Sequence, residues 1–203
     1  MTENNLLLIF IKNPEPGKVK TRLAATIGNH KAYQVYLKLL KHTILAAQDV
    51  DAGKQVWYSA FIDSDDFISE PEFDKKVQRG KNLGARMLHA FKNGFNEDYD
   101  NIVIIGSDCP DVDPELLEQA FNDLREHDLV IGPSADGGYY LLGMNTLREE
   151  LFSDIDWSTE RVLEQTLEKA KGLSLSVTCL PELNDIDTIE DLVKAGWDEA
   201  TSN

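Results

Sequence analysis

The sequence predicts an α/β domain in which a largely parallel sheet is covered by helices on both faces. Short apolar runs alternate along the chain with segments whose apolar residues recur at the helical period. Runs such as Leu6–Ile11 are apolar at consecutive positions, which is typical of strands buried on both faces. The chain has 203 residues, of which 42% are hydrophobic, and no long linker divides it. Residues 1–203 are therefore expected to form a single domain around one core.

The first half of the chain begins with the strand Leu6–Ile11, which ends at the Asn13-Pro14 turn. A helix is expected next because Val35, Leu39 and Ile44 keep a helical spacing. The elements expected in this half are strands at Leu6–Ile11, Val56–Phe61 and Phe73–Gln78, and helices at His30–Ala47 and Leu83–Phe95.

The second half contains the clearest strand, Asn101–Ile105, because its IVII run is β-branched and Gly106 ends it. Asp113 followed by Pro114 predicts the N-cap and first turn of a helix. The other elements expected are strands at Leu129–Ile131, Tyr139–Leu142 and Leu175–Cys179, a helix capped by Ser158 that runs to about Lys171, and a last helix at Thr188–Ala195.

The composition argues against two classes of partner. There are 36 acidic and 20 basic residues, which give a formal net charge of -16. So acidic a chain is not expected to bind nucleic acid or an anionic membrane surface.

The start of the chain and the cysteines bear on the compartment. Met1–Asn5 is polar, no signal peptide is recognised, and Cys109 and Cys179 provide no disulfide framework. We therefore expect a cytoplasmic protein.

The stretch NPEPGKVKTRL, directly after the first strand, is a candidate phosphate site. In open α/β sheets ligands bind at the carboxyl ends of the strands. Pro and Gly residues, Gly17 among them, fix a loop here, and Lys12, Lys20 and Arg22 supply cations that suit phosphate oxygens. The loop matches neither the Walker A nor the dinucleotide-binding pattern. On spacing alone, an ordinary solvated basic loop explains these residues equally well.

Two acidic segments are candidates for a metal site. Asp108 in GSDCPD follows the clearest strand, and Asp185 and Asp187 project in the same direction if LNDIDTIEDL is extended. Carboxylates in such places hold Mg²⁺ or Mn²⁺ together with water and substrate phosphates. Turn and cap roles are the alternatives, and for Asp187 taken alone a helix cap is favoured.

The segment GPSADGGYYLLG, residues 132–143, contains an Asp-Gly-Gly turn between two apolar runs. Asp-Gly is a strong hairpin signal. Its glycines would also allow the backbone to approach a ligand, with Asp136 beside it. A structural hairpin and a ligand-binding turn both remain open.

Taken together, the ordered motifs resemble a known family. KNPEPGKVKTRL, QRGKNLGARM, IGSDCPD, GPSADGGYYLLG, WST and LNDIDTIEDL are similar to small bacterial glycosyltransferase-A-like proteins, a family named as a domain of unknown function or as radical-SAM/selenodomain-associated transferases. The resemblance implies a three-layer, Rossmann-like glycosyltransferase-A (nucleotide-diphosphosugar transferase) fold with a mostly parallel mixed sheet. That superfamily includes small-molecule nucleotidyltransferases, such as the guanylyltransferases of molybdopterin and phospholactate metabolism.

The resemblance also implies roles for individual residues. Phosphate or nucleotide contacts are expected from Lys12, Gly17, Lys20 and Arg22, base and ribose contacts from Gly80, Asn82 and Gly84, and Mg²⁺ or Mn²⁺ ligands from Asp108, Asp185 and Asp187. One departure is visible: Gly106 replaces the first acid of the usual D-x-D, which leaves G-S-D.

The function implied is a metal-dependent transferase that uses a nucleotide-activated donor. The leading hypothesis is glycosyl transfer from a nucleotide sugar to a small-molecule acceptor, in which Lys20 and Arg22 stabilise phosphate charge and Asp136 orients or deprotonates the acceptor. Nucleotidyl transfer to a small molecule is the alternative within the same class. A non-catalytic nucleotide-binding module is the alternative of another class. A homo-oligomer is compatible with the sequence.

Overall fold

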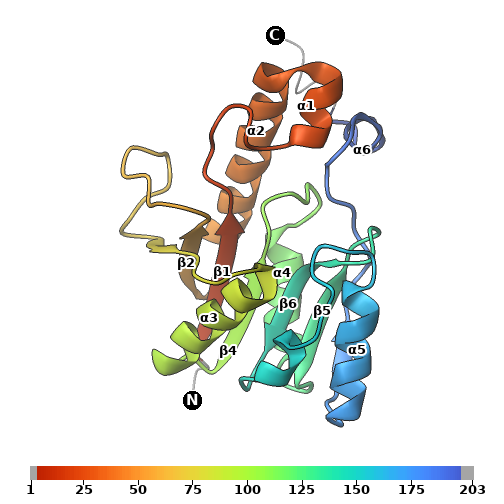
Figure 1. Ribbon diagram of the computed structural model, residues 1–203. Coiled ribbons are helices and arrows are strands. Elements are labelled where there is room, and N and C mark those ends of the chain that lie inside the picture. Colours follow the sequence, from red (N-terminus) through yellow and green to blue (C-terminus); the bar gives the residue numbers. More distant parts are fainter. Residues whose placement is uncertain (1–3, 198–203) are drawn as a thin grey trace.

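The computed structural model describes residues 4–197 and contains a seven-stranded sheet (Figure 1). The strand order is β3-β2-β1-β4-β6-β5-β7. All neighbouring strands are parallel except that β6 runs antiparallel to β4 and β5. The strands are β1 (Asn5–Ile11), β2 (Gly53–Tyr58), β3 (Asp74–Val77), β4 (Asn101–Ile105), β5 (Leu129–Pro133), β6 (Tyr139–Met144) and β7 (Val177–Cys179). The expected mixed, mostly parallel sheet is confirmed.

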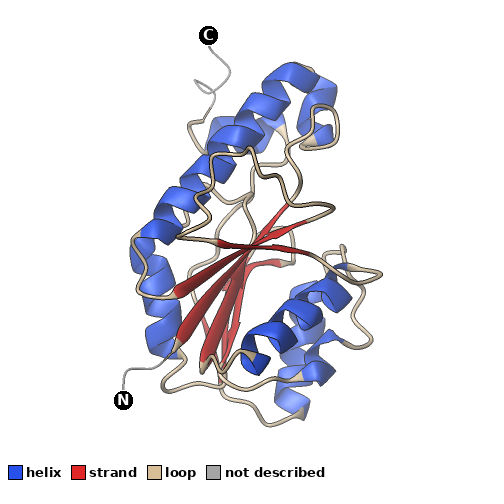
Figure 2. Ribbon diagram, turned by 90° about the vertical axis from the view of Figure 1, so that its left-hand side faces the viewer, coloured by secondary structure: helices blue, strands red, loops and turns tan. Residues whose placement is uncertain are grey.

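Helices cover both faces of this sheet, as Figure 2 shows. The helices are α1 (Thr21–Ile27), α2 (Asn29–Gln48), α3 (Leu83–Asn96), α4 (Pro114–Asp123), α5 (Val162–Gly172) and α6 (Ile189–Lys194), with a 3-10 turn at Glu149–Phe152. Alternate residues of β1 divide between the two layers of core: Leu7 packs with α2 and α4, and Leu8 packs with α3 and α5. This alternation explains why β1 is apolar at consecutive positions.

A third, smaller core lies among α1, α2 and α6 (Figure 1). Leu23 of α1, Leu39 of α2 and Leu192 of α6 are fully buried and belong to it. This cluster fixes the segment that precedes α6 against the loop that precedes α1. It therefore determines where two of the predicted site segments meet.

Among the element boundaries that differ from expectation, two have a clear local reason. β2 ends at Tyr58 rather than Phe61, because the Asn13 side chain binds the backbone of the next residues: its Oδ1 accepts from Ala60 N at 2.9 Å and its Nδ2 donates to Phe61 O at 2.8 Å. The prediction that Ser158 caps a helix was wrong. Ser158 has a φ of 67°, and α5 begins at Val162 without a side-chain cap.

Among the described residues, no helix combines the length and the apolar character that crossing a bilayer requires.

Candidate active site at the carboxyl edge of the sheet

Four loops meet at one edge of the sheet, because β1, β4, β5 and β7 run in the same direction and end there. Backbone hydrogen bonds join these loops: Ile186 N donates to Asp108 O at 3.0 Å, and Leu183 N donates to Pro133 O at 3.1 Å. The loop after β7 is thus held against the loops after β4 and β5. This is the edge at which ligands bind in open α/β sheets.

Lys20 lies buried among carboxylates rather than facing solvent. Its side chain is 3% exposed, and its Nζ lies 2.6 Å from Asp108 Oδ1 and 3.4 Å from Asp187 Oδ1. The backbone of Lys20 is left-handed, with φ 48° and ψ 45°, a conformation that costs a non-glycine residue about 1 kcal/mol or more. The ion pairs offset that strain. The lysine predicted from the loop motif therefore lies in the site, and the acidic segments are its partners.

Arg22, on the first turn of α1, completes this network. One of its terminal nitrogens lies 3.0 Å from Asp187 Oδ2, while the rest of the side chain is largely exposed. Arg22 therefore keeps donors available to a ligand, whereas Lys20 is enclosed.

Asp187 is not the helix cap that was favoured for it. Thr188 caps α6: its Oγ1 accepts from Asp191 N at 3.3 Å, and Asp191 Oδ2 accepts from Thr188 N at 2.8 Å. This capping box leaves the carboxylate of Asp187 free to pair with Lys20 and Arg22. The cap role favoured for Asp187 taken alone was wrong, because the sequence offered two adjacent residues that are able to cap.

Asp185 lies where negative charge accumulates. Burial is the main cause that raises its pKa to about 7, the neighbouring carboxylate of Asp108 is the second, and the ammonium of Lys20 opposes the shift. Asp136 and Asp187 add smaller effects that also raise the pKa. The carboxylates around Asp185 thus exceed the cations that neutralise them.

This donor set is compatible with a divalent cation. Mg²⁺ and Mn²⁺ prefer carboxylate oxygens, and Mg²⁺ is commonly held by one or two protein carboxylates plus water and substrate phosphates. Among residues 4–197, no group of three or more His, Cys, Asp or Glu side chains is arranged ready to hold a metal ion. The three-carboxylate set of Asp108, Asp185 and Asp187 is therefore not preassembled, and the metal site stays a prediction.

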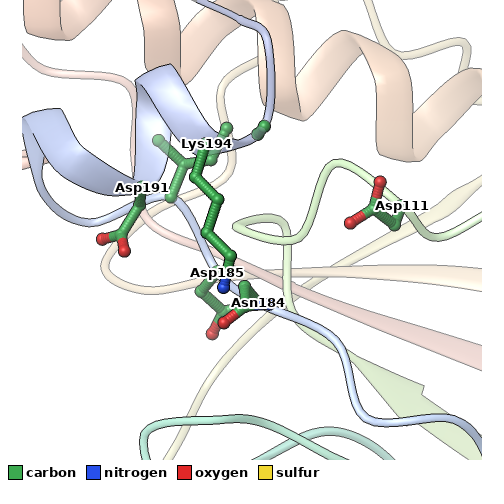
Figure 3. Close-up of a pocket in the computed structure, with 7 residues that line it drawn as sticks. Asp111, Asn184, Asp185, Asp191 and Lys194 are labelled. Atoms are coloured by element: carbon green, nitrogen blue, oxygen red, sulfur yellow. The ribbon is translucent and has the colours of Figure 1, made fainter.

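Asp185 borders three cavities. The largest, of about 420 Å³ (here called the main cavity), is lined by Arg22, Leu83, Asp136, Gly138, Tyr139, Trp157, Ser158, Thr159, Glu160, Val162 and Asp185. A second, of about 200 Å³, lies between Asp136 and Asp187. Figure 3 shows the third, also of about 200 Å³, in which Lys194 extends from α6 toward the segment of Asn184 and Asp185. A ligand in any of these cavities reaches the same carboxylate.

The Asp-Gly-Gly turn joins the antiparallel strands β5 and β6, so the hairpin alternative is present, and the role in ligand binding stays a prediction. Asp136 Oδ1 accepts from Gly138 N at 2.9 Å, which holds its carboxylate at the rim of the main cavity. Gly137 has a φ of 86°, and a Cβ there would lie 2.1 Å from the carbonyl oxygen of Glu160. The turn is therefore packed against Glu160, and both line the main cavity.

The segment QRGKNLG has structural roles at the positions predicted to contact base and ribose. Asn82 caps α3 by accepting from Ala85 N at 2.9 Å. A Cβ at Gly84 would lie 2.1 Å from the Trp157 ring, and a Cβ at Gly80 would lie 2.7 Å from the backbone of Ala85. These contacts account for the three residues without a ligand, and their nucleotide contacts stay predictions.

The structure gives no binding role to the other loop residues predicted to bind phosphate. Lys12 and Gly17 are exposed, and Lys12 forms no ion pair in the described part of the chain. Gly17 has a φ of 79°, which explains the glycine at this turn.

Several site residues were not predicted from the sequence. Tyr139, Trp157 and Glu160 line the main cavity. Gln78, which begins the segment predicted to lie near the base and ribose, has a structural role instead, since its Nε2 donates to Ile11 O at 3.1 Å and to Trp57 O at 2.8 Å. The WST motif marked the position of Trp157, but its residue types alone gave no role.

The comparisons with known proteins agree with this architecture. Residues 42–159 match the family described as "Uncharacterized protein conserved in bacteria (DUF2064)", and because this match covers more than half of the chain, the protein belongs to that family. A comparison with curated proteins finds no match.

Solved structures place the chain among nucleotide-diphospho-sugar transferase folds. A protein of Desulfovibrio desulfuricans G20, provisionally assigned as a nucleotide-diphospho-sugar transferase, is 35% identical over 100% of this chain and 90% of its own, with a TM-score of 0.90. CMP:2-keto-3-deoxy-manno-octonic acid synthetase in complex with CTP is 12% identical over 95% and 97% of the two chains, with a TM-score of 0.55. Rv0371c of Mycobacterium tuberculosis H37Rv in complex with manganese is 13% identical over 94% and 97%, with a TM-score of 0.59. At such identities the last two show the fold alone.

Proposed function

We propose that this protein is a metal-dependent glycosyltransferase that moves a sugar from a nucleotide sugar to a small-molecule acceptor. One observation supports this proposal: two cations and three carboxylates lie close together beside the three cavities that Asp185 borders. These residues are Lys20, Arg22, Asp108, Asp185 and Asp187. Cations and a carboxylate-bound divalent ion are what a diphosphate leaving group needs, because negative charge develops on it. The structural relatives named above include transferases, which supports assigning this chain to the same class.

In this proposal Asp108, Asp185 and Asp187 hold the ion, which supplies Lewis-acid stabilisation of the diphosphate when it is bound. Arg22 binds diphosphate oxygens with its exposed donors, and Lys20 neutralises the carboxylates behind them. Asp136 orients the acceptor hydroxyl at the rim of the main cavity and takes its proton. The hydroxyl oxygen forms a bond to the anomeric carbon, and the bond from that carbon to the diphosphate oxygen breaks, so that the diphosphate leaves with the electron pair.

Nucleotidyl transfer is the second candidate, and a specific observation favours it. The synthetase structure that shares this fold contains CTP. In that reaction an acceptor oxygen attacks the α-phosphorus and pyrophosphate leaves. Both candidates use the same cations and carboxylates, and they differ in the bond that breaks.

The test is a binding and turnover panel of nucleoside triphosphates and nucleotide sugars, each with Mg²⁺, with Mn²⁺ and with EDTA. A nucleotide at 100 times its Kd raises the free energy of unfolding by about 2.7 kcal/mol, which a thermal-shift assay detects. We expect metal-dependent stabilisation by a nucleotide sugar in the wild type, and its loss in Asp108→Asn. Asp65→Asn is the matched control, since Asp65 is an exposed aspartate that lines none of the three cavities.

Three outcomes decide between the alternatives. Stabilisation by a nucleoside triphosphate but by no nucleotide sugar favours nucleotidyl transfer. Binding without turnover of either donor class favours a non-catalytic module. If no nucleotide stabilises the wild type with any metal, the proposal is wrong.

A further inference from the structure

A small apolar pocket opens beside the main cavity. It has a volume of about 110 Å³, and its walls include Phe10 of β1, Met87 of α3 and Ile104 of β4. Leu83 and Tyr139 line both this pocket and the main cavity, so the two spaces adjoin. Among the described residues, none that lines the pocket carries a charged side chain. We call it the side pocket.

Gly106 lies at this pocket, and it is the residue that replaces the first acid of the D-x-D pattern. A Cβ at Gly106 would meet no heavy atom within 4 Å, and the backbone there is not left-handed. Neither close packing nor backbone conformation therefore requires a glycine. Its effect is to leave open space beside apolar walls where the usual pattern would place a carboxylate.

The main cavity has the opposite character, and its charge is unbalanced. Asp136, Glu160 and Asp185 line it, and Arg22 is the one cationic side chain among its lining residues. Arg22 is itself paired with Asp187 at 3.0 Å. A phosphate or carboxylate group on a second substrate would meet net repulsion in this cavity, whereas hydroxyl and ammonium groups would find acceptors.

From these two adjoining spaces we infer that the acceptor is an uncharged or cationic hydroxyl compound that bears a short branched apolar group. This inference rests on the proposed function, because it names the second substrate of that site. The hydroxyl end lies in the main cavity near Asp136, and the apolar group fills the side pocket. A cavity of about 150 Å³ binds benzene, so the side pocket suits a group somewhat smaller than an aromatic ring, such as an isobutyl group.

Three matched probes separate the two parts of the inference. Leucinol has a hydroxyl, an ammonium and an isobutyl group. Leucine replaces the hydroxymethyl group with a carboxylate, and serinol replaces the isobutyl group with a hydroxymethyl group. Binding is followed by methyl NMR of Met87 and Ile104, which report on the side pocket, and by the indole signal of Trp157 in the main cavity.

We expect leucinol to shift all three signals. Each buried carbon contributes a factor of roughly four to affinity, so leucinol should bind at least about tenfold more tightly than serinol. It should also bind at least about tenfold more tightly than leucine, because the carboxylate of leucine meets the acidic lining.

Two variants test the place of binding, each with a matched control. Gly106→Val fills the open space and should weaken leucinol binding by about tenfold or more, whereas Gly172→Val, at another exposed glycine with nothing within 4 Å, should leave it unchanged. Leu83→Gln removes an apolar wall of the side pocket and should also weaken leucinol binding. Leu173→Gln is its control and should leave binding unchanged, since these two leucines are similarly exposed, at 44% and 39%.

The failure of this inference is distinguishable from that of the proposed function. Equal binding of leucinol and leucine, unmoved Met87 and Ile104 methyls, or movement of those methyls by a nucleotide alone would overturn the inference, even if metal-dependent nucleotide binding is found. Leucinol binding at the two cavities without any nucleotide binding would support the pocket and overturn the donor site.

Discussion

Replacing Asp185 with Asn should stabilise the metal-free protein at alkaline pH, although it removes a residue proposed to bind the ion. Burial and the carboxylate of Asp108 raise the pKa of Asp185 from 3.8 to about 7 in the folded chain. Between these two pH values the folded state binds a proton that the unfolded state has released. The free energy of unfolding contributed by this group therefore falls as the pH rises from about 4 to about 7.

The magnitude follows from that shift. A difference of about three pKa units corresponds to about 4 kcal/mol at 1.36 kcal/mol per unit. Asp185 is half-buried, and screening by the solvent that reaches it lowers the expected effect to about 2 kcal/mol. At pH 5, Asp185 is still protonated in the folded chain but has already released its proton in the unfolded chain, so Asp185→Asn should be more stable than the wild type by less than about 1 kcal/mol. At pH 8, Asp185→Asn should be more stable by about 2 kcal/mol.

The assay is urea unfolding at pH 5 and pH 8 in EDTA. Asp128→Asn is a control for which we expect the opposite effect on stability at pH 8. Hydrogen bonds from Ser176 lower the pKa of Asp128, whereas the pKa of Asp185 is raised. The stability that Asp128 contributes is lost as the pH falls, so its replacement should destabilise the protein at pH 8. In a parallel titration, Mn²⁺ should raise the stability of the wild type and have little effect on Asp185→Asn. The reasoning is refuted if Asp185→Asn is less stable than the wild type at pH 8 in EDTA.

Three further substitutions test the structure around the site. Lys20→Met should lower the free energy of unfolding by about 1–3 kcal/mol, because it leaves Asp108 and its neighbours without their buried cation. Urea titrations measure this loss, and an unchanged urea midpoint would contradict the ion pairs. Gly137→Ala should cost about 2 kcal/mol or more in thermal unfolding, because its φ is positive and its Cβ would meet the backbone of Glu160; a loss below about 0.5 kcal/mol would contradict this packing. Thr188→Ala should cost about 1 kcal/mol in the same assay, and Thr188→Ser should restore most of it if the capping box is as described.

The largely parallel sheet and the edge at which the loops gather follow from features that the sequence displays, whereas the order of the strands was not predicted. Apolar runs such as Leu6–Ile11 identify buried strands, and the polar residues that follow parallel strands must share one edge. The grouping of Asp108, Asp136, Asp185 and Asp187 was predicted in this way, and their effect on the pKa of Asp185 shows that they are neighbours.

The partners of individual side chains were not predictable in the same way. Lys20 and Asp187 are 167 residues apart, and nothing local to either distinguishes a lysine that faces phosphate from one that faces carboxylate. Asn82 and Gly84 resemble ligand-binding residues in the sequence, yet one caps a helix and the other makes room for Trp157. Caps and close packing use the same small and polar residues as binding loops, so only the tertiary contacts separate them.

The carboxylates and cations of the site do not balance in charge, and this imbalance bears on how a ligand would bind. Asp108, Asp136, Asp185 and Asp187 meet Lys20 and Arg22, so the carboxylates outnumber the cations even where the loop concentrates its basic residues. A diphosphate alone would be repelled by this surplus, and a divalent ion alone would lack the phosphate oxygens that complete its coordination shell. Each therefore improves the site for the other, and by linkage the coupling must be equal in both directions. Under the proposed function, a chain with a net charge of -16 would bind an anionic donor by requiring the donor and the ion together, and Lys20 would hold the carboxylates in place until both are bound.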